Sequence, residues 1–198
     1  MGNALANQAD KHILQTAVLA SRATATIDDA DQFGGTQITG VDNTTGDGLA
    51  DAMWEAARVL DEKDVGEERV LFVRPAEFYA MAQSTKILNR DWGGEGSYAG
   101  GNVIRVAGIT IVKTNNLPST NVGTGTVEAG TGDKYAGDFS DTVGVIMHPS
   151  AVGTVKLLDL AMESEYQVSR QGTLMVAKYA MGHGILRPEA AIELSVTV

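Results

Sequence analysis

Cysteine is absent from the 198 residues of this chain. Disulfide bonds, thiolate metal sites and cysteine nucleophiles are therefore excluded. No apolar run approaches the about 18 residues of a membrane-spanning helix, and residues 1–25 lack the charged start and uninterrupted apolar core of a signal peptide. The sequence predicts a protein that neither spans a membrane nor carries a visible export signal.

Basic residues are also scarce relative to acidic ones. The chain has 15 lysine and arginine residues against 25 aspartate and glutamate residues, which gives a formal net charge of -10. Such a chain has no general attraction for phosphate backbones, so we expect any contact with nucleic acid to be local and weak. Hydrophobic residues make up 43% and charged residues 20%, as in ordinary globular proteins. This length fits one good-sized domain or two small, closely packed ones.

Histidine, the usual residue of acid-base and metal chemistry, occurs three times, as His12, His148 and His183. Their spacing matches no metal-ligand pattern. Ser150 follows His148 by two residues, but the strand-turn-helix context of a nucleophile elbow is missing. We therefore expect no metal, no cofactor and no enzyme activity. A hydrolase that uses His183 or His148 with a carboxylate is the alternative from a different functional class.

Helices and short strands are predicted in the first three quarters of the chain. Apolar residues recur at helical spacing over 4–22 and 50–63, and Pro75 opens a third helix over 75–84. The apolar run 69–73 predicts a buried strand, and 103–113 predicts a hairpin or a bent strand around Ala107-Gly108. Residues 115–138 are rich in Thr, Gly, Asn and Ser, which predicts a mobile excursion, and 143–147 predicts a further strand.

The last fifty residues have the pattern of long strands. Apolar and polar residues alternate over 156–168, which predicts a long strand with one exposed face. Two more extended segments follow at 173–184 and 185–198. Gly182 and Gly184 are expected to bend or bulge the strand between them. Pro188 should hold Arg187 in an extended conformation and begin a strand or lie at an edge.

These elements predict an α+β protein without a recognisable reaction centre. Long strands, two loop regions of low apolar content and no catalytic constellation suit a protein that works by contact with copies of itself.

Several short motifs carry a resemblance to a known family. The words SAVGTVKL, DLA, AKYAMGHG and LRPEAA, within 145–191, resemble in order and spacing the C-terminal region of the major capsid proteins of short-tailed, T-seven-like phages (podoviruses). Residues 45–81 are similar to the helix-strand-helix passage of tailed-phage capsid subunits in general. Together the two likenesses cover more than half of the chain.

The resemblance implies the Hong Kong 97-type capsid fold, in which a spine helix and a long-stranded sheet form a peripheral domain and an α/β axial domain is inserted. Residues 1–44 would then be the end of the spine helix and a connection, 45–154 the axial domain, and 155–198 the closing strands of the peripheral domain. The N-terminal arm and extended loop of that family are missing, so we expect a truncated core fragment.

The function that this resemblance implies is structural. The chain would be a subunit of an icosahedral shell, located in the virion, synthesised in the bacterial host cytoplasm, and assembled as hexamers and pentamers around double-stranded DNA that it does not bind sequence-specifically. Scaffolding and portal proteins would be its other partners. An encapsulin-like nanocompartment shell is the alternative within the same fold. Ion pairs between subunits or domains are expected to set register more than affinity, with these candidates: Arg58, Arg69, Arg170, Arg187 and Glu189.

Overall fold

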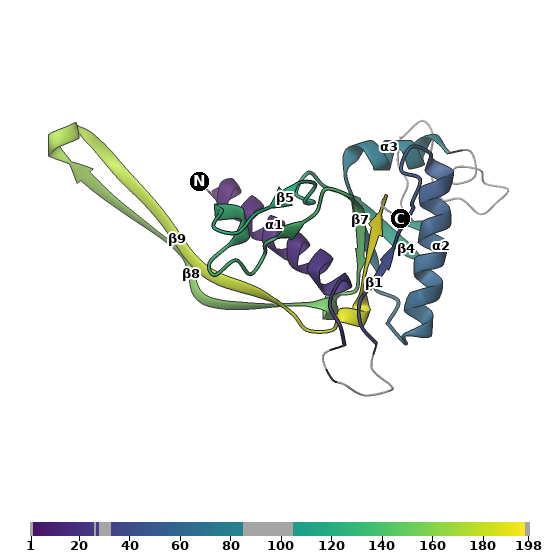
Figure 1. Cartoon of the computed structure of the whole chain (residues 1–198). Coiled ribbons are helices and arrows are strands. Elements are labelled where there is room, and N and C mark those ends of the chain that lie inside the picture. Colours follow the sequence, from purple (N-terminus) through teal and green to yellow (C-terminus); the bar gives the residue numbers. More distant parts are fainter. Residues whose placement is uncertain (1, 26, 28–32, 85–104, 197–198) are drawn as a thin grey trace.

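The computed structural model describes residues 2–25, 27, 33–84 and 105–196. This part of the chain contains three α-helices, a six-stranded sheet, a short two-stranded sheet and a long two-stranded hairpin (Figure 1). The helices are α1 (Gly2–Ser21), α2 (Gly46–Glu62) and α3 (Pro75–Gln83). The strands are β1 (Thr36–Ile38), β2 (Val70–Val73), β3 (Arg105–Val106), β4 (Ile109–Lys113), β5 (Asn121–Val122), β6 (Gly137–Asp138), β7 (Thr142–Met147), β8 (Val152–Gln167), β9 (Gly172–Ile185) and β10 (Ala191–Ser195).

The central sheet has six strands in the order β1-β10-β7-β2-β4-β3. Strand β10 pairs parallel with β1 and antiparallel with β7, and β2 pairs antiparallel with β7 and parallel with β4. The sheet therefore combines strands from all three of the segments 1–44, 45–154 and 155–198. The division of these segments into an axial and a peripheral domain stays a prediction.

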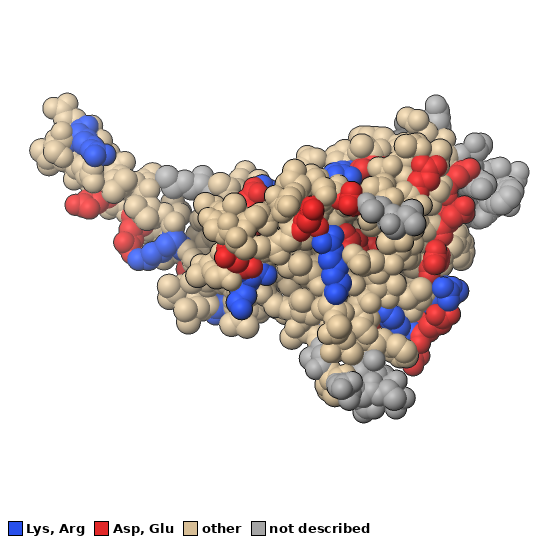
Figure 2. Space-filling view, in the orientation of Figure 1, with Lys and Arg blue, Asp and Glu red and all other residues tan. Residues whose placement is uncertain are grey.

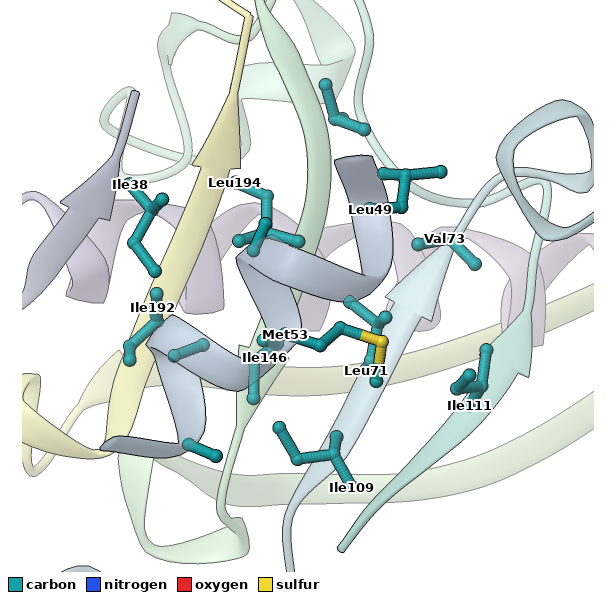
Figure 3. Packing of buried hydrophobic residues seen from close by; sticks show 14 of the residues in the cluster. Ile38, Leu49, Met53, Leu71, Val73, Ile109, Ile111, Ile146, Ile192 and Leu194 are labelled. Carbon is teal, nitrogen blue, oxygen red and sulfur yellow. The ribbon is translucent and has the colours of Figure 1, made fainter. Parts of the chain in front are cut away.

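Helices α2 and α3 cover one face of the sheet, where the larger apolar core lies (Figure 3). Met53 from α2 packs among Leu71 and Ile146 of the strands, and all three side chains are fully buried. Complete burial of side chains of this size stabilises the fold by roughly 1.5–3 kcal/mol each. The strands at 70–73 and 142–147 confirm the strands predicted from their apolar runs.

Helix α1 covers the opposite face of the sheet and has a core of its own. Its C-terminal half buries Leu14 and Val18 against Val145 of β7 and Phe139. Val145 and its neighbour Ile146 lie in the two different clusters, as alternation along a strand requires. The helix confirms the one predicted at 4–22.

The prediction of a mobile excursion over 115–138 is wrong. This stretch forms the β5–β6 pair and the 3-10 helix η2 (Val127–Ala129), and it buries Leu117, Val122 and Ala129 against α1. Few apolar side chains are present, but those few dock onto a helix that lies about a hundred residues away in sequence. Local composition could not show that partner.

Helix α2 begins at Gly46, four residues before the predicted start. Thr45 is its N-cap, because the Thr45 hydroxyl accepts a hydrogen bond from the Gly48 N–H at 3.3 Å. Gly46 also permits close packing on α3: a Cβ at this position would lie 2.4 Å from the Ala80 carbonyl oxygen. The cap and the missing side chain together place the start of α2 directly on α3.

The predicted hairpin at 103–113 is present as the antiparallel pair β3–β4, while residues 103 and 104 lie outside the described ranges. Ala107 and Gly108 both have positive φ angles, 51° and 77°, as a two-residue hairpin turn requires.

The end of the chain departs from the prediction of one extended segment over 185–198. A 3-10 turn, η5 (Pro188–Ala190), interrupts it. Pro188 opens that turn and does not begin a strand, although Arg187 is extended as predicted, with φ -125° and ψ 96°. Strand β10 lies inside the sheet, between β1 and β7, and is buried along its length. Among the helices of the described ranges, none is long and apolar enough to cross a membrane.

Candidate subunit interface

Strands β8 and β9, joined by the 3-10 turn η4 (Val168–Arg170), form a hairpin that projects from the body of the molecule (Figure 1). We call Val152–Ile185 the arm. A two-stranded ribbon is marginally stable in water without a packing partner. Nearly all of β8 is exposed, so the prediction of a strand with one buried face is wrong within a single copy. The arm's exposed large apolar residues are Val155, Leu157, Leu158, Leu160, Met162, Tyr166, Val168, Leu174, Met175, Val176 and Ile185.

The two faces of the outer arm differ in charge. Residues directly opposite each other in an antiparallel pair share a face. One face carries the pairs Met162–Ala177, Ser164–Met175 and Tyr166–Thr173, none of which is charged. We call these six residues the uncharged face.

The opposite face of the outer arm carries Glu163, Glu165 and Lys178 among apolar residues. Lys178 and Glu163 form an exposed ion pair with Nζ and Oε1 2.6 Å apart. On the uncharged face, Met162, Tyr166 and Met175 are 64%, 62% and 52% exposed. Most of the arm surface visible in Figure 2 is neither acidic nor basic. Only the uncharged face can be covered without burying an ion.

The bulges of the arm lie in β8, not at the predicted glycines. The pairing shifts between Lys156 and Leu158, and again between Leu158 and Ala161, so β8 contains the extra residues. Gly182 and Gly184 sit in regular register, opposite Val155 and Gly153, and a Cβ on either would meet nothing within 4 Å. The predicted bulge at these two glycines is therefore wrong, and a bend at them stays a prediction.

The base of the arm is held against α1 and the 115–138 region by an aromatic cluster. The His12 ring stacks on Tyr135 with centroids 4.4 Å apart, and the His183 ring is tilted against Tyr135 with centroids 6.1 Å apart. The backbone N–H of His183 donates to the Tyr135 hydroxyl at 2.9 Å, and the Nδ1 of the His183 ring is 2.9 Å from the Thr154 hydroxyl. Burial lowers the pKa of both imidazoles, and at His12 the neighbouring His183 lowers the pKa further.

Two of the arginines proposed as subunit or interdomain contacts, Arg58 and Arg69, lie in α2 or against it. Arg58 is exposed and pairs with Glu62 of the same helix, one turn further along. Arg69 is only 8% exposed and donates to the carbonyl oxygens of Ala57, Val65 and Gly66. Its guanidinium also binds Asp61, with Nη2 and Oδ1 2.6 Å apart.

Arg69 therefore closes the C-terminal end of α2 inside one copy of the chain. The hydrogen bonds of Arg69 all lie within one copy, and its contact with another subunit or domain stays a prediction.

The remaining charged candidates lie at the two ends of the arm. Arg170 is in the turn at the arm tip, where every neighbouring residue is exposed. Arg187 and Glu189, just past the arm base, pair with each other at 2.7 Å, and Glu189 is buried. A contact of Arg58, Arg170, Arg187 or Glu189 with another subunit stays a prediction.

The hydrolase alternative finds no assembled site in the described residues. His148 caps the 3-10 turn η3 (Pro149–Ala151): its Nδ1 accepts from the Ser150 N–H at 3.2 Å and lies 2.8 Å from the Ser150 hydroxyl. The same ring nitrogen thus serves a local turn. Across the described ranges, no three His, Cys, Asp or Glu side chains form a group that could hold a metal ion.

Sequence reasoning missed a buried ion pair and the role of Tyr135. Arg22 at the end of α1 binds Glu193 of β10, and the two lie 171 residues apart. Tyr135 lies in a segment expected to be mobile. No local pattern marks these residues, because each obtains its partner only when distant segments meet.

Comparisons with known proteins agree with this architecture. A family model described as "Gp10A-like: Major capsid protein" matches residues 1–195. The chain belongs to the Gp10A-like major capsid protein family. It is 41% identical to the major capsid protein of Escherichia phage T7 over 102 residues and 39% identical to that of Enterobacteria phage T3 over 101 residues. These matches cover 46% of this chain and 29% of each relative.

Solved capsid structures share the fold of this family member. The capsid structure of the cyanophage P-SCSP1u matches with a TM-score of 0.87 and 40% identity, over 98% of this chain and 63% of that one. A virus-like particle from Pyrococcus furiosus matches with a TM-score of 0.60 at 12% identity, which shows a common fold alone. Membership of this family assigns the chain a structural role as a phage capsid protein. The hydrolase and nanocompartment alternatives are not favoured. The chain spans less than two thirds of the length of these relatives.

Proposed function

We propose that this chain is the core of a phage major capsid subunit and that the uncharged face of the arm is its contact with a neighbouring copy. The exposure of this face is the observation that carries the proposal. Met162, Tyr166 and Met175 expose more than half of their surface in the isolated subunit. Monomeric soluble proteins seldom leave so extended an apolar surface uncovered unless a partner covers it.

A second copy is the partner that fits best. A shell repeats one subunit contact many times, so each contact can be modest and the closed lattice still holds. The apolar side chains provide the contact, and the charged side chains on the opposite face stay in solvent. The acidic net charge of -10 suits a container that encloses double-stranded DNA without gripping it.

The finer assignments belong to the same proposal. We infer hexamers and pentamers of the full subunit, assembly with scaffolding and portal proteins, synthesis in the bacterial host cytoplasm, and no enzymatic or cofactor-dependent step. The segments 1–44 and 155–198 would form the peripheral domain and 45–154 the axial domain. Family membership and the projecting arm support these assignments.

Two adjacent substitutions test the contact. Met175→Lys places a charge on the uncharged face, whereas Leu174→Lys places the same charge on the face that already carries Glu163, Glu165 and Lys178. Sedimentation velocity over a concentration series should show that Met175→Lys weakens self-association at least about tenfold, which corresponds to about 1.4 kcal/mol. Leu174→Lys should have a much smaller effect. Equal effects, or an unmodified chain that stays monomeric at every concentration, would contradict the proposal.

A further inference from the structure

The point where the arm leaves the body is built around two imidazoles and one phenol ring. His12 comes from α1, Tyr135 from the loop before β6, and His183 from β9. The Tyr135 ring contacts both histidines, with centroid distances of 4.4 Å to His12 and 6.1 Å to His183. Three segments that are distant in sequence therefore meet at one cluster, which borders an open pocket of about 800 Å³.

Each histidine is held by hydrogen bonds that suit its neutral form. The Gln8 amide nitrogen lies 2.8 Å from the His12 Nε2, and an amide N–H donor at this position pairs with an unprotonated Nε2. The His183 Nδ1 is paired with the Thr154 hydroxyl, while its Nε2 is buried without a hydrogen-bond partner among the described residues. The protonated imidazole must carry an N–H at that Nε2, a buried donor for which the described residues offer no acceptor, which is costly.

The charged surroundings also disfavour two protonated histidines. Burial lowers the pKa of His183, and burial followed by the charges of His183 and Lys11 lowers that of His12, against the opposing effect of Glu128. Protonation of both would place two interacting positive charges next to the Tyr135 ring. The titratable groups around the cluster are Lys11 and Glu128, which form an ion pair at 3.6 Å, together with Lys134, Tyr135 and Tyr179 at the pocket wall.

The cluster sits where it can control the direction of the arm. His183 and its partner Thr154 lie on opposite strands near the arm base. Tyr179 adds one further bond to α1, from its hydroxyl to the Leu5 carbonyl oxygen at 3.3 Å. Leu160 and Met181 of the arm also lie beside α1, and beyond Tyr179 nearly all residues of both strands are exposed up to the tip.

We propose that His12, Tyr135 and His183 form a pH-sensitive clamp that fixes the arm to α1, and that protonation of the two histidines releases the arm. The clamp is closed when both imidazoles are neutral. Because both folded pKa values lie below the ordinary value, the clamp's stabilisation is complete above about pH 6.5 and is lost as the pH falls below it, through the folded pKa values. This inference concerns one copy of the chain and does not depend on how copies assemble.

The absence of native cysteine allows a direct distance measurement. Spin labels would be attached to the double variant Ser169→Cys and Glu55→Cys, which places one label at the arm tip and one on the exposed side of α2. The distance between the two labels would then be measured by pulsed electron-electron double resonance at about pH 7.5 and about pH 5, on either side of the ordinary histidine pKa. We expect one narrow distance distribution at the higher pH and a broad distribution at the lower pH.

Substitutions that cannot be protonated identify the cause. His12→Gln retains a nitrogen or oxygen near the Gln8 amide, and His183→Asn retains one near the Thr154 hydroxyl, so the double variant should keep the narrow distribution at both pH values. His148→Asn lies outside the clamp, so its distance distribution should broaden at the lower pH as that of the unsubstituted protein does. Far-UV circular dichroism and the unfolding midpoint at about pH 7.5 establish that each variant is folded.

The clamp would be overturned by two results. One is an unsubstituted arm whose distance distribution is the same at both pH values. The other is a folded double variant whose arm broadens at low pH as much as that of the unsubstituted protein, because another group would then be responsible. If the double variant does not fold, His12→Gln and His183→Asn are tested singly, and the absence of any reduced broadening in both overturns the proposal.

Discussion

Arg22 and Glu193 form a two-pronged ion pair that joins the end of α1 to strand β10 of the central sheet. The Arg22 Nε lies 2.7 Å from one carboxylate oxygen and its Nη2 lies 2.6 Å from the other. Gln37 and Thr142 donate to the same carboxylate at 2.7 and 2.6 Å. The Glu193 side chain is 1% exposed, so these four bonds replace its hydration completely. The pair fixes α1, which supports the arm, on the sheet.

Removal of the Glu193 charge should destabilise the fold. Glu193→Gln leaves Arg22 without its counter-ion, and loss of one partner of a buried pair costs about 3 kcal/mol. Chemical denaturation followed by circular dichroism measures the change. The matched control is Glu163→Gln, which removes the same charge from the exposed pair with Lys178 on the arm and should leave the unfolding midpoint nearly unchanged. Equal midpoints for the two variants would contradict this account of Glu193.

The same carboxylate should make the protein sensitive to acid. Burial opposes the ionisation of Glu193, but the bonds from Arg22, Thr142 and Gln37 outweigh it and hold the pKa below its ordinary value. A lowered folded pKa contributes stability that is complete above the unfolded pKa of about 4.3 and is lost as the pH falls through the folded value. The free energy of unfolding, measured against pH, should fall more steeply in this acid range for the unsubstituted chain than for Glu193→Gln. Parallel curves would show that Glu193 is not the group responsible.

Substitution by alanine should change the stability of the fold differently at Gly46 and at Gly182. At Gly46 the added Cβ would lie 2.4 Å from the Ala80 carbonyl oxygen and 2.8 Å from the Ser84 Cβ, so α2 must move away from α3. We expect Gly46→Ala to destabilise the fold by about 1–3 kcal/mol. At Gly182 nothing lies within 4 Å of the added atom, and Gly182→Ala should be neutral or stabilising by up to about 1 kcal/mol. Thermal or chemical unfolding distinguishes them, and a large loss at Gly182 would restore its predicted backbone role.

Substitution of the two arginines of the α2 region, Arg69 and Arg58, should change the stability of the fold by different amounts. Arg69→Met removes the donors that serve three carbonyl oxygens at the end of α2, and we expect a loss of about 2 kcal/mol. Arg58→Met removes only an exposed pair within the helix, which contributes less than about 0.5 kcal/mol. Denaturation midpoints provide the comparison. If Arg69→Met left stability unchanged but reduced self-association, its original prediction as a subunit contact would be correct.

Local sequence patterns predicted the elements whose signals are local. The apolar spacing in α1 and α2, the proline at the start of α3 and the short apolar runs of β2 and β7 all lie within the elements that they specify. The start of α2 was placed too late, because Thr45 and Gly46 act through a cap and through contact with α3.

Long-range contacts account for the failures. Over 115–138 the composition indicated mobility, but Leu117, Val122 and Ala129 find α1 as a surface on which to pack. Tyr135 and His183 meet across 48 residues, and no spacing rule connects them. In the arm, the alternation around Met162 and Tyr166 correctly indicated a strand, but the buried face that it also indicated is absent within one copy. The proposed explanation of its exposure is that the partner is another copy of the chain.

The most direct test of the proposed contact uses single thiols on the two faces of the arm. Met175→Cys and Leu174→Cys each introduce the only cysteine of the chain, on adjacent residues of β9. The rate of reaction with a thiol reagent would be measured for dispersed and for assembled protein. We predict that assembly strongly slows the reaction at position 175 and changes it little at position 174. Equal rates at both positions in the assembled protein would contradict the claim that copies meet through the uncharged face.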